Sequence, residues 1–290
     1  MKATSFFVAF LSLLLLPLPA FADFVQTTTC NPGSMGNDRC RAGEEPRPVQ
    51  WFRQSIPYFI HDQGSQDIHP GEFEITDHLR NTIISSFETW NDQECSLFEM
   101  RFAGLTPDAP IGTEGGTISI ENLSNVVVFR DGFWPHPGYN AVALTTVTFR
   151  PSSGEILAAD IEFNTADYEF TNTEGREGAV IDVRNTLTHE AGHFLGLDHT
   201  FVTDATMFAT APPAEISKRE LHPVDIEGLC SIYPLSREYE EDTDPPRGEE
   251  ERRGCFRCAQ SSGGPDGTML AFLGLVAAGL ILRRRREAFS

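Results

Sequence analysis

Apolar and polar residues between Thr76 and Trp90 follow the period of an α-helix. Every third or fourth position is apolar, which places four side chains on one helix face: Leu79, Ile83, Phe87 and Trp90. A hydroxyl or carboxylate just before a helix caps its free N–H groups, and Thr76 or Asp77 stands at that position. The pattern predicts one long helix whose apolar face belongs to the core.

Shorter apolar runs on both sides of this helix indicate β-strands. Ile56, Tyr58 and Ile60 alternate as the buried face of a strand does, and Pro57 among them has no N–H to donate to a neighbouring strand. We therefore expect a first strand near the edge of a sheet. Further runs predict strands at 97–102, 116–121, 126–130, 141–150 and 156–163.

Two more helices are expected in the second half of the chain. Asp182 can cap a helix that includes His193, and His222 precedes another, with Pro223 at its first helical position. The order is strand, long helix, several strands, helix and helix, without an internal repeat. This mixture predicts a single α/β (α+β) domain at 48–236, long enough to bury a core of ordinary size.

The N-terminal residues 1–22 are typical of a secretory signal peptide. Lys2 precedes an apolar run at 6–16, and small residues at 20–22 form a cleavage site. The alternative, a transmembrane helix, is disfavoured because the run is short and is followed by prolines. We expect an exported protein with a short, turn-rich lead at 23–47.

Export would place the six cysteines in an oxidising compartment, where disulfides persist. Cys30 and Cys40 are close enough in sequence to close a small loop. Cys95 and Cys230 are far apart and would join two distant parts of the fold. The sequence alone does not fix the pairing.

The C-terminal part differs in composition from the rest. Residues 237–254 are charged and contain prolines without an apolar period, which predicts a disordered acidic linker. The tail at 255–290 has two cysteines, an apolar run at 269–282 and a closing group of arginines. It resembles the C-terminal sorting tails of myxobacterial surface proteins. That resemblance implies recognition by the export machinery, followed by attachment to the cell surface or release.

A simple membrane anchor is the alternative for this tail, although its apolar run is shorter than the roughly 20 residues that span a bilayer. In either case we expect membrane contact through the tail alone. The net charge of -20 and pI of about 4.7 argue against nucleic acid as a partner, because phosphate binding needs clustered cations. We expect a monomer.

The sequence HEAGHFLGLDH carries the candidate chemistry. His189 and His193 are four residues apart, so a helix places both imidazoles on one face, where they can hold one zinc ion. Glu190 beside them is a candidate general base. Gly196 can adopt backbone angles closed to other residues, which lets the chain turn and bring in His199 as a third ligand. Three imidazoles leave one zinc position open for water, as in catalytic zinc sites.

This HExxHxxGxxH pattern, with Met207 eight residues after His199, resembles the metzincin metallopeptidases. The order of elements over about 48–234 is similar to their matrixin branch. The resemblance implies a metzincin catalytic domain: a twisted, mixed five-stranded sheet with a long helix, an active-site helix and a C-terminal helix. It also implies that Met207 packs beneath the metal without binding it.

The same resemblance implies zinc-dependent hydrolysis of peptide bonds in protein or peptide substrates, with Glu190 as the general base. The alternative is a non-catalytic cell-surface binding module that retains a structural zinc site. An intact Glu190 favours the enzyme, because a structural site needs no base. The substrate and the cleavage preference do not follow from the sequence.

One feature of many matrixins has no counterpart here. They hold a second, structural zinc through histidines on the central strands, and the matching stretches of this chain have none. We therefore expect no structural zinc, and we expect the nearby His136 to lie in a surface loop. Asp160, Glu162 and Asn164 alternate along one strand and offer oxygens to a calcium ion, with an ordinary solvated strand face as the alternative.

Overall fold

The computed structural model describes residues 23–30, 45–108, 124–136, 140–173 and 180–239, together with the backbone of 270–277. The predicted signal peptide, the strand predicted at 116–121 and most of the predicted linker and tail lie outside these residues. Within the part of the chain that is described, no helix is both long and apolar enough to cross a bilayer.

Five strands form one mixed sheet in the spatial order β5-β6-β4-β2-β3. Their bounds are Ser55–His61 for β2, Glu99–Thr106 for β3, Val126–Phe129 for β4, Ala141–Phe149 for β5 and Ile156–Phe163 for β6. The strands β3, β2, β4 and β6 are parallel, and β5 is antiparallel to β6. The predicted five-stranded mixed sheet is thereby confirmed.

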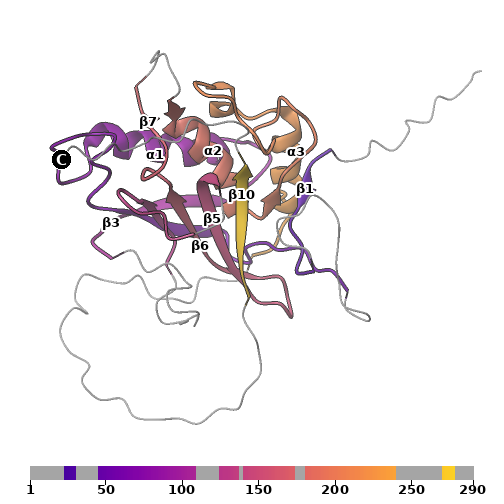
Figure 1. The fold of residues 1–290 in the computed structure, drawn as a ribbon. Coiled ribbons are helices and arrows are strands. Elements are labelled where there is room, and N and C mark those ends of the chain that lie inside the picture. The colour runs from indigo at the N-terminus through magenta and orange to yellow at the C-terminus, as the bar shows by residue number, and fades with distance from the viewer. Residues whose placement is uncertain are drawn as a thin grey trace, which may run out of the picture.

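A sixth strand, β10 (Leu270–Ala277), extends this sheet at β5. It runs antiparallel to β5, and Gly274 is the register partner of Thr145. Figure 1 shows β10 in yellow beside β5. The apolar part of the C-terminal tail therefore pairs with the main sheet. The role of the tail in sorting or anchoring stays a prediction.

The strand that contains Pro57 lies near the edge of the sheet, as predicted, but is not the edge strand itself. β2 is second from the edge, with β3 outside it and β4 on its inner side. Backbone pairing with β4 begins only at Phe59, whose N–H donates to the carbonyl of Asn125 at 2.7 Å. At Pro57, the side-chain amide of Asn125 donates to the proline carbonyl at 2.8 Å. A proline is tolerated in this inner strand because, on the side that faces β4, the strand has no backbone partner at Pro57, where the N–H is missing.

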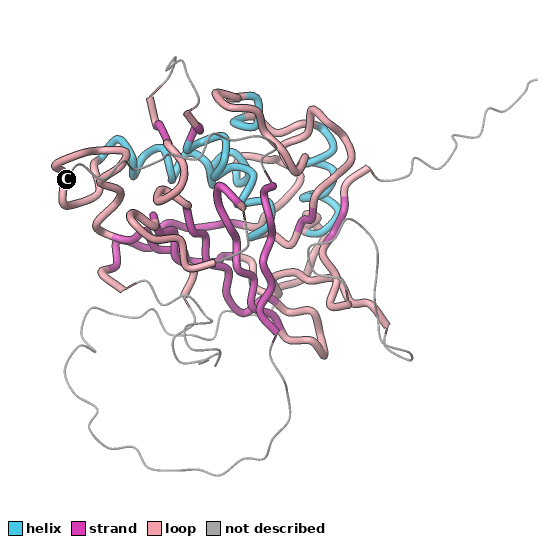
Figure 2. The backbone as a smooth tube through the Cα atoms, in the orientation of Figure 1, coloured by secondary structure: helices cyan, strands magenta, loops and turns pink. Residues whose placement is uncertain are grey.

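Two helices pack against each other above the sheet, as Figures 1 and 2 show. The helix α1 (Asp77–Asn91) is the predicted long helix, and Thr76 is its N-cap, with a side chain that accepts from the N–H of Leu79 at 3.2 Å. The helix α2 (Val183–Phe194) carries the motif histidines. The indole N–H of Trp90 on α1 donates to the carbonyl of Thr188 on α2 at 2.8 Å, which fixes one helix against the other.

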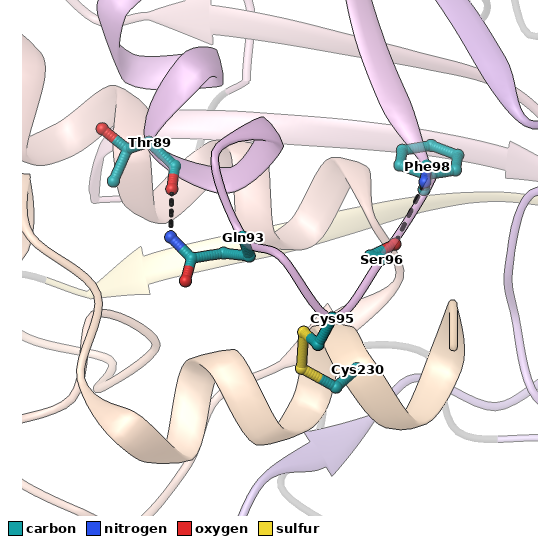
Figure 3. The surroundings of a disulfide bond; sticks show 6 residues. All are labelled: Thr89, Gln93, Cys95, Ser96, Phe98 and Cys230. Atoms are coloured by element: carbon teal, nitrogen blue, oxygen red, sulfur yellow. Dashed lines mark hydrogen bonds between the residues drawn. A yellow bond between two sulfur atoms is a disulfide. The ribbon is translucent and has the colours of Figure 1, made fainter. Parts of the chain in front are cut away.

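A disulfide joins the end of the long helix to the C-terminal helix. Cys95 follows α1, and Cys230 lies on α3 (Pro223–Ile232), with 5.5 Å between their Cα atoms. Figure 3 shows this bond beside the turn that follows α1. The predicted link between these two cysteines is confirmed. Cys30 is disulfide-bonded, and Cys40 lies outside the described residues, so their mutual pairing stays a prediction.

Short strands place the N-terminal lead and the start of α2. The strand β1 (Val25–Gln26) pairs antiparallel with β9 (Leu197–Asp198), which directly precedes His199. The parallel pair β7 (Phe170–Thr171) and β8 (Ile181–Asp182) leads into α2. The lead therefore contacts the segment that carries the third motif histidine.

Candidate metal centre

The helix α2 begins at a well-defined cap. Asp182 accepts a hydrogen bond from the N–H of Asn185 at 2.7 Å, as an N-cap carboxylate does. Arg219 holds the same carboxylate through two N–H groups at 2.9 and 2.6 Å. The predicted cap is confirmed, and it sets the rotation of the helix that presents His189 and His193 on one face.

Gly196 turns the chain back toward the helix. Its φ is +95°, a conformation that side-chain-bearing residues rarely adopt. A Cβ at this position would also lie 2.3 Å from the carbonyl oxygen of Val49. Only glycine fits here, and the turn delivers β9 and then His199 to the site.

The three histidines converge as the motif predicts. The Nε2 atom of His199 lies 3.3 Å from Nε2 of His189 and 3.2 Å from Nε2 of His193. Two nitrogens bound to a tetrahedral zinc ion at about 2.0–2.1 Å are about 3.3–3.4 Å apart, so these separations suit one zinc ion. Among the described residues, this is the one group of three or more His, Cys, Asp or Glu side chains arranged to hold a metal.

Hydrogen bonds and burial prepare these histidines as ligands. Nδ1 of His189 donates to the carbonyl of Thr206 at 2.6 Å, and Nδ1 of His193 donates to the carbonyl of Leu197 at 2.8 Å. Each bond leaves the lone pair on Nε2, the atom that faces the other rings. Burial lowers the pKa of all three imidazoles below the usual value, so each stays in the neutral form that binds metal.

Glu190 lies fully buried next to the histidines. Its Oε2 accepts a hydrogen bond from the hydroxyl of Thr145 on β5 at 2.6 Å, while Oε1 has no partner among the described residues. Burial raises the pKa of this carboxyl to about 8, an effect that the Thr145 hydrogen bond partly offsets. A carboxylate with one tethered and one available oxygen can accept a proton from a water molecule.

Met207 packs directly against the helix α2, while its predicted place beneath the metal stays a prediction. A Cβ added to Gly192 of α2 would lie 2.1 Å from Sδ of Met207 and 3.0 Å from the ring of Trp90. Met207 can therefore pack this closely against α2 only because position 192 has no side chain.

Asp225 holds the turn that carries Met207, a role not predicted from the sequence. Its carboxylate accepts from the backbone N–H of Thr206 at 2.7 Å and from that of Met207 at 3.0 Å. The same side chain accepts from the N–H of His222 at 3.0 Å and completes a capping box at the start of α3. An acidic residue three positions after the N-cap was the available signal.

The candidate calcium residues have protein partners in this structure. The Oδ1 atom of Asp160 accepts from the N–H of Val126 at 3.1 Å. Glu162 is fully buried between Nε of Arg130 at 2.6 Å and Nε2 of His136 at 2.7 Å.

Asn164 donates through its amide to the carbonyl of Ala141 at 3.0 Å. Asp160, Glu162 and Asn164 therefore form no solvated face, because all three are buried. Calcium binding stays a prediction. His136 lies in a loop, as expected, but its ring is partly buried against Glu162 because a buried carboxylate needs a partner.

Comparison with known proteins gives a family match over most of the domain. The matrixin family (peptidase family M10) matches residues 50–234. Metalloendoproteinase 2-MMP of Arabidopsis thaliana is 24% identical over 210 residues, which cover 72% of this chain and 51% of that protein. Karilysin of Tannerella forsythia is 25% identical over 184 residues, which cover 63% of this chain and 33% of that protein. The chain thus spans about half, or less, of the length of these relatives.

Proposed function

Because the chain belongs to the matrixin family, we propose that it is a zinc-dependent endopeptidase that hydrolyses peptide bonds in protein or peptide substrates. The observation that carries this proposal is the convergence of the three Nε2 atoms beside a buried glutamate with one available oxygen. His189, His193 and His199 would hold the metal. When bound, zinc supplies a Lewis acid for the substrate carbonyl and lowers the pKa of water to about 7.

Residues of the chain itself carry out the proton transfers and orient the groups that take part. Oε1 of Glu190 accepts the proton from the attacking water and then passes it to the nitrogen of the departing amine. Thr145 holds Oε2 of the same carboxylate, so that the accepting oxygen keeps one position. Thr206 and Leu197 orient two of the ligand rings through their carbonyl oxygens. No covalent intermediate with the protein is required.

The test uses the full chain with zinc and a variant that removes only the base. Glu190→Gln keeps the shape of the side chain and should retain stoichiometric zinc, while cleavage of a denatured protein falls by about a hundredfold or more. Glu227→Gln, an exposed change on α3, is the matched control and should leave cleavage unchanged. A chelator should abolish activity, and added zinc should restore it.

The outcome also separates the two candidate functions. Stoichiometric zinc binding without cleavage of any denatured protein would favour the alternative, a non-catalytic cell-surface module with a structural zinc. Equal cleavage by the wild type and by Glu190→Gln would show that Glu190 is not the base.

Export to the cell surface, or release after processing of the tail, is part of the proposal. The signal-peptide pattern at 1–22, the tail at 255–290 and the disulfide between Cys95 and Cys230 support it, because structural disulfides persist in oxidising compartments. Fractionation of cells that express the chain tests it. Recovery of the protein with an uncut N-terminus in the cytoplasm would contradict export.

A further inference from the structure

A pocket opens directly beside one of the metal-binding histidines. The empty space between its walls and in the solvent at its mouth together measures about 390 Å³. His189 lines it on one side, and apolar groups contribute much of the rest: Val142, Ile181, Ala211 and Pro212. A pocket that touches a ligand of the metal is placed to receive a substrate side chain next to the bond that is cut.

Lys218 gives this pocket an unusual lining. It is the only cationic residue of the lining within the described part of the chain, and it is 3% exposed. Its ammonium group donates to the carbonyl oxygens of Phe208 and, at 3.0 Å, Thr210. The ring of Phe208 lies 6.0 Å from the ammonium nitrogen. An ammonium has three N–H donors, so one is not used by these two carbonyl oxygens. No carboxylate oxygen of the described residues lies within 4.0 Å of it.

The position of Lys218 is fixed from both sides. It lies in the middle of a short 3-10 helix, Ser217–Arg219. Its own backbone N–H donates to Oδ1 of Asn185 on α2 at 2.8 Å, and the neighbouring Arg219 is bound to Asp182. The lysine is therefore held against the helix that carries the histidines, and its order costs no further entropy when a ligand binds.

A buried ammonium without a close carboxylate is costly, and a suitable acceptor from a ligand would offset that cost. Burial lowers the pKa of Lys218 to about 8, while the charges of Glu215, Asp225 and Glu190 act in the opposite direction. The amine is still mostly protonated at neutral pH. Asp225 is committed to three backbone N–H groups and Glu215 to the hydroxyl of Ser217, so neither replaces a ligand acceptor.

We propose that Lys218 is a specificity residue that selects substrates whose side chain in this pocket ends in an oxygen acceptor, as in glutamine and glutamate. The apolar walls would contact the methylene groups of that side chain, and the third N–H of the ammonium would bind its terminal oxygen. An aliphatic side chain such as leucine would leave the N–H without a partner. This inference rests on the proposed peptidase function.

The preference set by Lys218 is tested with peptides that differ at one position. The zinc-loaded full chain is given peptide sets with Gln, Glu or Leu on either side of a fixed scissile bond. We expect kcat/KM to be at least about tenfold higher for Gln or Glu than for Leu at one of the two positions, because a site built for an acceptor rejects an analogue that lacks it. Lys218→Met should abolish this preference and leave the zinc content unchanged.

Two further variants keep the test decisive if Lys218→Met does not fold. Lys218→Gln retains amide donors for the carbonyl oxygens and should reduce the preference, most of all for Glu. Glu215→Gln removes the acidic group on the pocket wall and should shift the preference from Gln toward Glu. A wild-type enzyme that prefers Leu, or a loss of activity in Lys218→Met that is equal for all three peptides, would overturn the proposal.

A binding measurement separates this inference from the proposed function. The same peptides are titrated by calorimetry into the zinc-loaded Glu190→Gln variant, with and without Lys218→Met. Tighter binding of the Gln and Glu peptides that depends on Lys218 supports the inference even if the wild type cleaves nothing. If the chain cleaves peptides but the Kd values show no Lys218-dependent preference for Gln or Glu, the inference is wrong and the proposed peptidase function is unaffected.

Discussion

The hydroxyl of Thr145 donates a 2.6 Å hydrogen bond to Oε2 of Glu190, which joins the strand β5 to the active-site helix. Both groups are fully buried, so the bond has no competition from water. It occupies one oxygen of the proposed base and leaves the other available. The strand that borders the site thus also orients the carboxylate.

Thr145→Val should weaken both catalysis and stability. The isosteric change leaves Oε2 buried without a donor, which costs about 1–3 kcal/mol in the free energy of unfolding. We expect kcat to fall while zinc binding is retained, because the histidines are untouched. Urea unfolding and single-turnover peptide cleavage measure the two effects. Thr145→Ser keeps the hydroxyl and should behave like the wild type; a Val variant with unchanged kcat would contradict the orienting role.

Gly192→Ala should disturb the contact between α2 and Met207. Alanine is favoured over glycine in a helix by about 1 kcal/mol, but overpacking a dense core costs about 1–3 kcal/mol. The added Cβ would stand 2.1 Å from Sδ of Met207, so we expect a net loss of thermal stability. Met207→Ala alone opens a cavity and should also lower the stability of the folded protein.

The double variant Gly192→Ala/Met207→Ala distinguishes this contact from a general effect on the helix. Because the new methyl group fills space that the methionine vacates, the combined loss should be smaller than the sum of the two single losses. Strict additivity in the free energies of unfolding would show that the two residues are not coupled.

Asp225→Asn should loosen the turn beneath the metal. The amide that replaces the carboxylate has only one acceptor oxygen for three backbone N–H groups. We expect a loss of about 1–3 kcal/mol in the free energy of unfolding, together with weaker zinc binding, since Thr206 also orients His189. Chelator competition measures the affinity. Glu227→Gln, two residues along α3, is the control and should change neither quantity.

Much of the site follows from local sequence rules. The spacing of His189, His193 and His199 and the glycine between them fix the ligand geometry, because helix periodicity and the φ of +95° at Gly196 are local properties. The caps Thr76 and Asp182 were predictable for the same reason, and their hydrogen bonds are formed within a few residues. Local chemistry therefore predicts the elements and the metal ligands.

Long-range partners were not predictable in this way. Thr145 is 45 positions from Glu190, and Lys218 is 33 positions from Asn185, so no periodicity joins them. The inner place of β2 depended on Asn125, which supplies a side-chain donor where the strand has a proline. Such contacts depend on how the sheet strands are ordered, and a single sequence with short strands does not encode that order locally.

The tail strand β10 covers the edge of β5 next to the site. Gly274 is the register partner of Thr145, whose hydroxyl binds Glu190. An open strand edge at this point would offer its N–H and C=O groups to an extended peptide. We therefore expect an extended peptide substrate to compete with β10 for this edge.

Replacing both Leu273 and Gly274 with proline should release β10. Successive residues of a strand direct their N–H groups to opposite sides, so one of the two prolines must remove a donor that faces β5. We expect faster hydrogen exchange of the amides in 141–149 and faster cleavage of an extended peptide, because the edge becomes accessible. The matched control replaces the same two residues with alanine and should keep the pairing. Exchange and cleavage that are equal in the proline and alanine variants would mean that β10 does not protect this edge.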